Sequence, residues 1–389
     1  MKLLFITDFT EQFPYRLLRG ILDYSRRSGE VWEVRKMPPS FKREVGLRGI
    51  VSWARKWNAD VVIGQFDPQD DLSLFRKSGI VVMAQDYIQP FSGVPNITAD
   101  YHATGVLAAE QFFGHGFKNF GFFGYSGVCW SDGRLRGYED RIREEGLGDR
   151  LYIYDRQQIN SVWNYDSPEL RQWLLMLPKP AGVFACDDNQ AEILLEACNA
   201  CGINVPMEVA ILGVDNDEVT CNMTSPALSS IDMDIEKAGF EAADIATQMV
   251  KTRNFTGEDI VIQPVSVVGR ASTGIVATKD KVVSDAVRFI YQNRGRKILV
   301  SDVLKQVPVS RRLLETRFKD VTGMSIYSFI SHLRMEYFAH ELVSSSDTIS
   351  EIAARMDEPD TKSISRRFQA LRGCTPSEYR KRELRKLSV

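Results

Sequence analysis

Apolar and polar positions alternate along residues 1–275 in two different rhythms. Short apolar runs that end at Gly, Asp or Asn have the length and composition of buried β-strands. Between them lie longer segments whose apolar residues recur every three or four positions, which is typical of amphipathic helices. The expected strands are 2–8, 59–66, 80–86, 119–127, 181–188 and 209–216, and the expected helices are 15–29, 71–79, 103–117, 134–147 and 189–202. This alternation predicts an α/β fold of parallel sheets flanked by helices.

The pattern changes near residue 276, after which only helical segments are expected. An apolar stripe over 282–291 is followed by two similar units, about 300–323 and 350–373, in which Arg317–Phe318 returns as Arg367–Phe368. Each unit consists of a short helix, a tight turn and a second helix, so the pattern predicts an all-α domain with two helix-turn-helix motifs. Residues 326–343 between the units form an expected helix of about 27 Å. Adjacent half-sites on one face of DNA lie roughly 34 Å apart, so a spacer of this order lets one chain read two turns of groove.

Charge is divided unevenly between the two parts of the chain. Residues 276–389 hold 22 Lys and Arg against 14 Asp and Glu, whereas residues 1–275 hold 27 against 37. An acidic body with a basic end favours a polyanionic partner at that end. A basic surface that is simply solvated is the alternative.

The second helix of each unit has an apolar face and a polar face. Leu314 and Phe318, like Ile364 and Phe368, are four positions apart and are expected to pack inward. The candidate DNA contacts on the other face and first turn are Ser310, Arg311, Arg312 and Thr316, then Thr361, Lys362, Ser363, Ser365 and Arg366. Arg pairs bidentately with guanine, while Lys, Ser and Thr mostly anchor phosphates. The alternative is a helical bundle that dimerises through basic helices.

Acidic, amide and aromatic side chains collect at the ends of the expected strands. They are Asp8, Asp86, Trp130, Asp187, Asp188, Asn189, Asp215 and Asn216. Ligands of open parallel sheets bind at this edge, and no GxGxxG or GxxxxGK[ST] sequence is present to hold a phosphate. Carboxylates and amides suit vicinal hydroxyls, an indole suits the face of a sugar ring, and Arg134 can donate to two oxygens. The pattern therefore predicts a sugar site, although any single Asp can instead be a turn or helix cap.

Residues 2–275 resemble the LacI-type regulators and their periplasmic sugar-binding relatives. The resemblance lies in "VFACDDNQA", "VAILGVDNDE" and "PALSSIDMDIEKAGFEAADI". It implies two lobes that close on a small ligand, lobe 1 being about 1–120 and 235–255 and lobe 2 about 121–234 and 256–275. The implied ligand contacts are Asp8, Phe9, Asp100, Arg134, Asp188 and Asp215, with Trp130 added from its place in the sequence. The family often has Gln where Met233 stands, and Asp232 is the expected substitute.

Residues 282–384 resemble the AraC-type DNA-binding domain. "IAARM" followed by "SISRRFQALRGCTPSEYRKR" matches that family's signature at Phe368, Gly373, Thr375, Pro376, Tyr379 and Arg380. The turn before the second recognition helix departs from it, because "MDEPD" stands in place of the customary Gly-Phe. The specificity of the second DNA reader is therefore open.

Together these patterns predict a sugar-responsive transcription regulator with no catalytic activity, cofactor or metal, divided into residues 1–275 and 276–389. The domain order is that of pentose-operon regulators and implies operator DNA, a small sugar (xylose or a related pentose) and a second copy of the chain as partners. RNA polymerase is a further candidate. With no export signal or membrane span expected, the location is cytoplasmic, and Cys198 and Cys201 are expected to be helix-packing residues. The alternatives are a body that serves only for dimerisation, and a glycosidase that uses Asp8 and Asp215.

Overall fold

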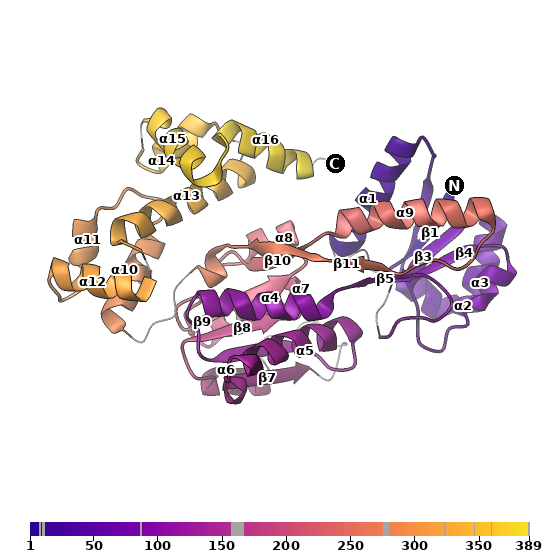
Figure 1. Cartoon of the computed structure of the whole chain (residues 1–389), viewed down its shortest axis with the longest axis horizontal. Coiled ribbons are helices and arrows are strands. Elements are labelled where there is room, and N and C mark those ends of the chain that lie inside the picture. The colour runs from indigo at the N-terminus through magenta and orange to yellow at the C-terminus, as the bar shows by residue number, and fades with distance from the viewer. Residues whose placement is uncertain are drawn as a thin grey trace. The chain divides into compact units, whose positions relative to one another are not determined.

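The structure is a computed structural model that describes residues 1–7, 9, 12–85, 88–156, 167–274, 280–322, 324–345, 347–358 and 360–387. It divides into two compact units, residues 1–274 and residues 275–389. Each unit is described by itself, with its helices and strands labelled as in Figure 1. Among the described residues, no helix has both the length and the apolar character needed to cross a membrane.

The first lobe of residues 1–274 is built on a sheet of parallel strands in the order β11-β5-β4-β3-β1-β2. The strands are β1 (Lys2–Ile6), β2 (Glu33–Met37), β3 (Val61–Gln65), β4 (Val81–Gln85), β5 (Asn96–Ala99) and β11 (Ile260–Ile262), and the helices are α1 (Gln12–Ser28), α2 (Pro39–Trp57), α3 (Ser73–Lys77) and α9 (Ile235–Thr252). The central strands are buried over most of their length, as a sheet with helices on its faces requires.

The second lobe repeats this plan with the order β12-β10-β9-β8-β6-β7, in which β12 alone runs antiparallel to its neighbour. Its strands are β6 (Phe120–Tyr125), β7 (Leu151–Arg156), β8 (Ala181–Ala185), β9 (Val209–Val214), β10 (Ser229–Met233) and β12 (Pro264–Val268), and its helices are α4 (Tyr101–Gly114), α5 (Cys129–Glu144), η1 (Gly148–Arg150), α6 (Pro168–Met176), α7 (Asp188–Ala200), α8 (Glu218–Met223) and η2 (Ala271–Thr273). Cys198 lies in the core of this lobe and Cys201 ends α7, which confirms that they are helix-packing residues; none of the six cysteines forms a disulfide.

The chain passes between the lobes three times: from β5 to α4, from β10 to α9, and from β11 to β12. Hydrogen bonds join these crossovers, since Asp100 N donates to Ile262 O (2.9 Å) and Asp234 N donates to Gln263 O (3.1 Å). The lobe boundaries expected from the sequence therefore need correction. Residues 101–120 were expected in lobe 1 and residues 260–262 in lobe 2, but α4 packs on α5 in the second lobe and β11 belongs to the first sheet. The apolar stripe of a helix does not say which sheet the helix covers.

Each lobe contains one pair of helices packed unusually closely, α1 with α9 and α4 with α5 (Figure 1). Glycines make this possible. A Cβ atom on Gly20 of α1 would lie 1.9 Å from Glu236 O, and one on Gly137 of α5 would lie 1.9 Å from His102 O. No side chain fits at these distances, so the two glycines set how near the helices come.

In the described part of residues 280–387, the regular elements are all helices: α10 (Lys281–Gln292), α11 (Val300–Leu304), α12 (Arg311–Thr322), α13 (Ile326–Ser344), α14 (Ile349–Arg355), α15 (Thr361–Arg372) and α16 (Pro376–Leu387). α13 has 19 residues and so a length of about 28 Å. It connects the group α10–α12 to the group α14–α16 (Figure 1). Two α/β lobes followed by a helical domain with two helix-turn-helix motifs confirm the predicted fold class.

Candidate ligand site and DNA-reading helices

Arg134 is the centre of a polar cluster at the carboxyl end of the second sheet. Its side chain extends from α5, is almost completely buried, and donates through Nη1 to Cys186 O and through Nη2 to Asp215 Oδ1 (3.3 Å). The guanidinium lies 5.6 Å from the ring centres of both Tyr101 and Trp130. Its Nε has no hydrogen-bond partner among the described residues. A buried, charged donor that is still unsatisfied is costly unless a further acceptor binds to it.

Asp215 occupies the turn directly after β9. Its φ of 94° lies in the left-handed region, which non-glycine residues rarely adopt, and Asn216 follows with a φ of 48°. The backbone is held in this conformation by hydrogen bonds, because Asp215 N donates to Ile231 O (3.0 Å) and Asn216 N donates to Ser230 Oγ (2.9 Å). Strained residues of this kind cluster at functional sites. The turn presents the carboxylate of Asp215 to Arg134.

The neighbouring carboxylates Asp187 and Asp188 have different environments. Asp188 is 3% exposed and its Oδ2 accepts from Asp217 N (2.7 Å) and from the thiol of Cys221, so it fixes the turn after β9 from below. Asp187 is half-buried, caps α7 through Gln190 N (2.7 Å), and belongs to the cluster of Arg134 and Asp215. The ligand contact of Asp188 stays a prediction. α7 begins at Asp188, one residue earlier than expected, so Asp187 is the residue that caps the helix.

Burial and the nearby Asp215 carboxylate raise the pKa of Asp187 to about 6, against the lowering effects of the Gln190 N–H and of Arg134. Burial also raises the pKa of Asp188 well above its ordinary value. The edge of the sheet is therefore a site where carboxyl groups are poorly solvated.

Arg16 reaches the same turn from the first lobe. Its Nη1 donates to Asp215 O (2.8 Å) and to Asp232 Oδ1 (3.0 Å), and its Nη2 donates to Met233 O (3.0 Å). Its Nε and Nη2 also form a two-pronged contact with the Glu236 carboxylate (2.8 and 2.7 Å). Burial lowers the pKa of Arg16, but Glu236 and Asp232 outweigh this effect and raise it. Arg16 of α1 is thus hydrogen-bonded to the turn after β9, to strand β10 and to the start of α9.

Of the remaining predicted ligand residues, Asp100 and Asp232 lie at or near the crossovers and Phe9 follows β1. Asp100 caps α4 through Ala103 N (2.8 Å), Asp232 is paired with Arg16, and Met233 is buried beside Thr104 Oγ1 (3.8 Å). Phe9 packs edge-on against Tyr15, with Lys36 Nζ 4.9 Å above its ring. Asp8 and Asp86 lie outside the described residues. Asp100 forms a helix cap, and its contact with a ligand stays a prediction.

Several residues of the cluster were missed from the sequence. Tyr101 is the first residue of α4, Tyr125 ends β6 with its ring against Trp130, and Gln190 Nε2 donates to Tyr125 Oη (2.7 Å). The position of Tyr125 at a strand end was a readable signal. Tyr101 and Arg16 gave no such signal, because their role depends on helices that pack from distant parts of the chain.

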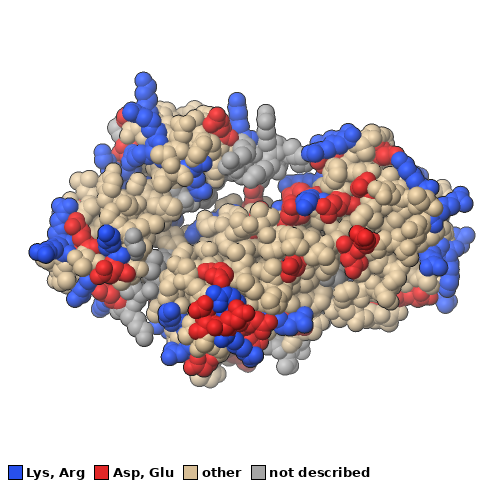
Figure 2. Space-filling view, in the orientation of Figure 1, with Lys and Arg blue, Asp and Glu red and all other residues tan. Residues whose placement is uncertain are grey.

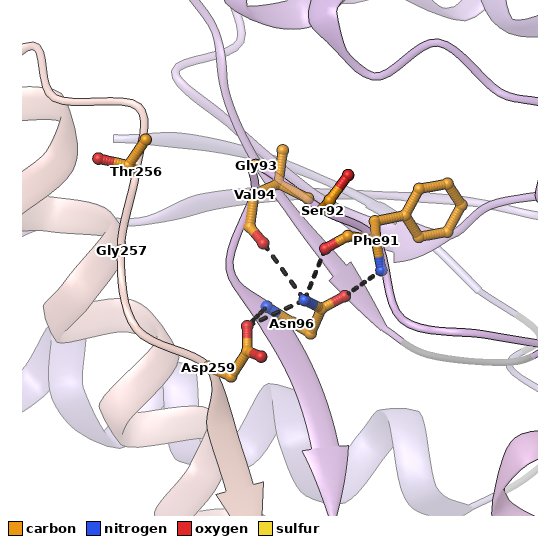
Figure 3. Close-up of a pocket in the computed structure, with 8 residues that line it drawn as sticks. All are labelled: Phe91, Ser92, Gly93, Val94, Asn96, Thr256, Gly257 and Asp259. Carbon is orange, nitrogen blue, oxygen red and sulfur yellow. Dashed lines mark hydrogen bonds between the residues drawn. The ribbon is translucent and has the colours of Figure 1, made fainter.

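A separate hollow of about 340 Å³ lies at the amino ends of β5 and β11, away from this cluster. Figure 3 shows Asn96 in its wall, hydrogen-bonded to Phe91, Val94 and Asp259. Asn96 Nδ2 donates to Phe91 O (2.9 Å) and Asp259 Oδ1 (2.9 Å), while its Oδ1 accepts from Phe91 N (2.7 Å). The amide is committed to joining the loop before β5 to the segment before β11, so this hollow has a structural explanation.

In the second unit the two second helices, α12 and α15, bury the apolar residues that were expected to face inward. Leu314, Phe318, Ile364 and Phe368 are all 0% exposed, which confirms this part of the prediction. The candidate DNA contacts lie at the surface: Ser310, Arg311, Arg312, Thr316, Lys362 and Arg366 are exposed, and Thr361, Ser363 and Ser365 are partly exposed. Figure 2 shows Lys and Arg side chains standing out over α12 and α15. Arg311 is paired with Glu315 one turn away (2.9 Å).

Comparison with known proteins agrees with this division of the chain. Residues 109–273 match the periplasmic binding protein-like domain and residues 303–382 match a helix-turn-helix domain. The xylose operon regulatory protein of Escherichia coli K12 is 25% identical, with 97% of this chain and 96% of that protein aligned. That of Haemophilus influenzae is 26% identical, with coverage of 97% and 98%. The chain is thus similar to xylose-operon regulatory proteins over almost its whole length.

The solved structure described as the xylose-binding transcription activator xylR has the same architecture. It superposes with a TM-score of 0.72 at 24% identity, over 98% of this chain and 97% of that one. The chain is a sugar-responsive transcription regulator with an AraC-type DNA-binding domain. The relatives are regulators of transcription rather than enzymes.

Proposed function

We propose that this regulator binds a pentose, xylose or a close relative, at the polar cluster around Arg134, and that the bound sugar changes how its two helix-turn-helix motifs are presented to operator DNA. The observation that carries the proposal is the state of Arg134. It is buried between two aromatic rings, beside two carboxylates, with one N–H unsatisfied among the described residues. The relatives whose names include xylose match this chain along almost its whole length, and pentose is therefore the ligand class that we propose.

The chemistry of a pentose fits this cluster. Its vicinal hydroxyls can donate to the Asp187 and Asp215 carboxylates and accept from Arg134, while a ring face packs against Trp130 or Tyr101. We include Phe9 and Asp8, which follow β1 in the sequence, as the proposed ligand contacts of the opposite lobe. Epimers differ in the direction of one hydroxyl, so a single unpaired group in this pocket is enough to discriminate between them.

Coupling to DNA requires that the sugar bind one arrangement of the lobes more tightly than another. Asp215 is suited to this task because its carboxylate is paired with Arg134 and its carbonyl with Arg16. A sugar that draws the carboxylate toward itself shifts the turn that Arg16 holds, and Arg16 in turn holds the crossover strand and α9. The expected result is a change in the angle between the lobes.

The test is a titration of the full chain with D-xylose, L-arabinose, D-ribose and D-glucose. All six tryptophans lie within residues 1–275, so tryptophan fluorescence reports thermal unfolding of the sensor alone. A sugar at a hundred times its dissociation constant stabilises the native state by about 2.7 kcal/mol. A shift with one pentose, accompanied by a changed affinity for operator DNA, supports the proposal. No shift with any sugar, and unchanged DNA binding, would instead indicate a body used only for dimerisation.

The DNA contacts proposed on α12 and α15 can be tested separately. Arg312→Ala and Arg366→Ala each remove one exposed arginine. Loss of a bidentate arginine–guanine pair costs about 1–3 kcal/mol and relaxes the sequence preference at that base, while loss of a phosphate contact weakens binding to all sequences alike. Footprinting should show each variant losing protection over a different half-site. Loss from the same half-site would contradict two separate readers.

We further infer a homodimer that acts in the cytoplasm and, where the operator adjoins a promoter, contacts RNA polymerase. Support comes from the general behaviour of helix-turn-helix proteins, which commonly bind two half-sites as dimers. Sedimentation of the full chain with and without DNA tests the dimer, and transcription from a selected promoter with purified polymerase tests the contact.

A further inference from the structure

We propose that Glu358 is the positioning residue of the second DNA-reading helix, and that it fixes α15 to the connecting helix α13 so that the two readers keep one spacing on DNA. The proposal rests on the function proposed above, in which α12 and α15 read DNA. It concerns the turn where the sequence departs from the AraC-type pattern.

A single carboxylate oxygen joins three elements at this turn. Glu358 lies between α14 and α15, and its Oε2 accepts from Arg334 Nη1 of α13 (3.2 Å) and from Arg367 Nη2 of α15 (2.6 Å). The side chains of Glu358 and Arg334 are only 11% and 5% exposed. Arg334 Nη2 also donates to Met356 O (2.6 Å) at the end of α14. The turn, the reading helix and the connecting helix therefore meet at one buried ion cluster.

The first helix-turn-helix motif has a different turn between its two helices. Fifty positions earlier, Val307 and Pro308 stand where Asp357 and Glu358 stand in the second unit, and Val307 is buried. Arg317, which corresponds to Arg367, lies 3.6 Å from Asp280 at the start of α10. The turn of the first helix-turn-helix motif is thus apolar, whereas the turn of the second motif is charged. Asp357 adopts a φ of 55°, the left-handed conformation for which Gly is customary at such a turn.

The same turn also approaches the first group of helices. Lys297 N, between α10 and α11, donates to Asp357 Oδ2 (3.4 Å). Nearby, the Arg294 guanidinium lies 5.6 Å from the ring centre of Tyr337 on α13. The contacts of residues 357 and 358 consequently reach both groups of helices, in the place where the distance between α12 and α15 is set.

Ion clusters of this kind add little stability compared with apolar packing, but their hydrogen bonds are directional. A phenylalanine in this turn could slide against its neighbours, whereas Glu358 accepts from two arginines on two helices at fixed angles. Burial alone would raise the pKa of Glu358, but Arg367 and Arg334 outweigh it and lower the pKa. The group is therefore a carboxylate near neutral pH, as the two contacts require.

The experiment uses Glu358→Gln in the full chain and a DNA duplex selected by the wild-type chain from a random-sequence pool. Footprinting first locates the two protected half-sites. Affinity is then measured for the parent duplex and for duplexes in which one or two base pairs are added or removed between the half-sites. We expect the wild type to bind the parent spacing about tenfold or more tightly than the altered ones. For Glu358→Gln the preference should shrink to about threefold or less.

The control is Ile352→Val, which weakens the same apolar core without touching the ion cluster. If Glu358 acts only through stability, both variants will lower the active fraction equally on every duplex and leave the spacing preference unchanged, which overturns the proposal. Far-UV circular dichroism establishes that both variants are folded. A wild-type chain that protects only one half-site would overturn the two-reader function itself, and with it this inference.

Discussion

Arg134 and Arg16 approach the same residue, Asp215, from opposite lobes. Each arginine lies about one turn before a glycine at which its helix touches a neighbouring helix, Gly137 on α5 and Gly20 on α1. In both lobes the glycine brings the second helix close, and that helix supplies the next partner of the arginine: Tyr101 for Arg134 and Glu236 for Arg16. The same local arrangement has been used twice.

The two arginines differ in what they leave unsatisfied. Arg16 uses all three of its nitrogens on Glu236, Asp232, Met233 and Asp215. Arg134 retains an Nε without a partner among the described residues, and two aromatic rings lie beside it in addition to the Asp215 carboxylate. A fully paired arginine suits a connection between parts of the protein, and an incompletely paired one suits a ligand. From this comparison we propose that Arg134 contributes to sugar affinity and that Arg16 couples sugar binding to the arrangement of the lobes.

The largest expected effect is on sugar binding by Arg134→Ala. The substitution removes the donor and leaves the Asp215 carboxylate without its partner, so we expect a loss of about 2–5 kcal/mol of binding free energy. Isothermal titration calorimetry measures this loss, with the sugar that stabilises the wild-type chain in the titration described above. Arg136→Ala, an exposed position on the same helix, is the matched control. Equal affinity for the two variants would remove Arg134 from the site.

The glycine contacts should show the next largest effect. An added methyl group at Gly137 or Gly20 would meet a backbone oxygen at 1.9 Å, so the helices must move apart. Gly137→Ala and Gly20→Ala should each lower the free energy of unfolding by about 1–3 kcal/mol. Urea titration followed by tryptophan fluorescence measures the change. Gly114→Ala on α4, where the added methyl group meets no atom within 4 Å, should leave stability almost unchanged.

Arg16→Met should weaken the effect of sugar on operator binding while changing the affinity for sugar much less. It keeps the apolar stem but releases the Asp215 carbonyl and the carboxylates of Asp232 and Glu236. We expect the ratio of operator affinities with and without saturating sugar to move toward one, a loss of about 1–2 kcal/mol of coupling. The sugar dissociation constant should change less than in Arg134→Ala. Arg19→Met, further along α1, serves as the control, and a wild-type ratio in Arg16→Met would show that coupling takes another route.

The sequence was sufficient to predict the fold because the apolar rhythm records burial directly. β1, β3, β4, β6, β8 and β9 are central strands with continuous apolar runs, and all were expected. β2 was not, since Glu33, Arg35 and Lys36 are exposed on the edge of the sheet and interrupt its pattern. α2 was also missed, because Gly46, with a φ of 66°, breaks its periodicity.

The site was less predictable, for two physical reasons. Asp187 and Asp188 are adjacent in the sequence, and which one faces inward depends on where α7 begins. Arg16 is about 200 positions from each of its partners, so no local pattern marks it. Arg134 was found because it lies four positions from Trp130 in the sequence and beside the same residue in the fold.

The smallest expected effect is on the pH dependence of stability, and it concerns the carboxyl group of Asp187. Because the pKa of Asp187 is about 6 in the folded chain against an ordinary 3.8, the native state holds more protons than the unfolded state between these values. The free energy of unfolding must then fall as pH rises through this window. Asp187→Asn removes this contribution, so its stability should fall less steeply than that of the wild type between about pH 4 and 6, with tryptophan fluorescence in urea as the measurement. Asp149→Asn, at a side chain that is 79% exposed, should follow the wild type. Parallel curves for wild type and Asp187→Asn would mean that Asp187 is well solvated in the folded chain. The cluster around Arg134 would then contain one poorly hydrated carboxylate fewer than the structure indicates.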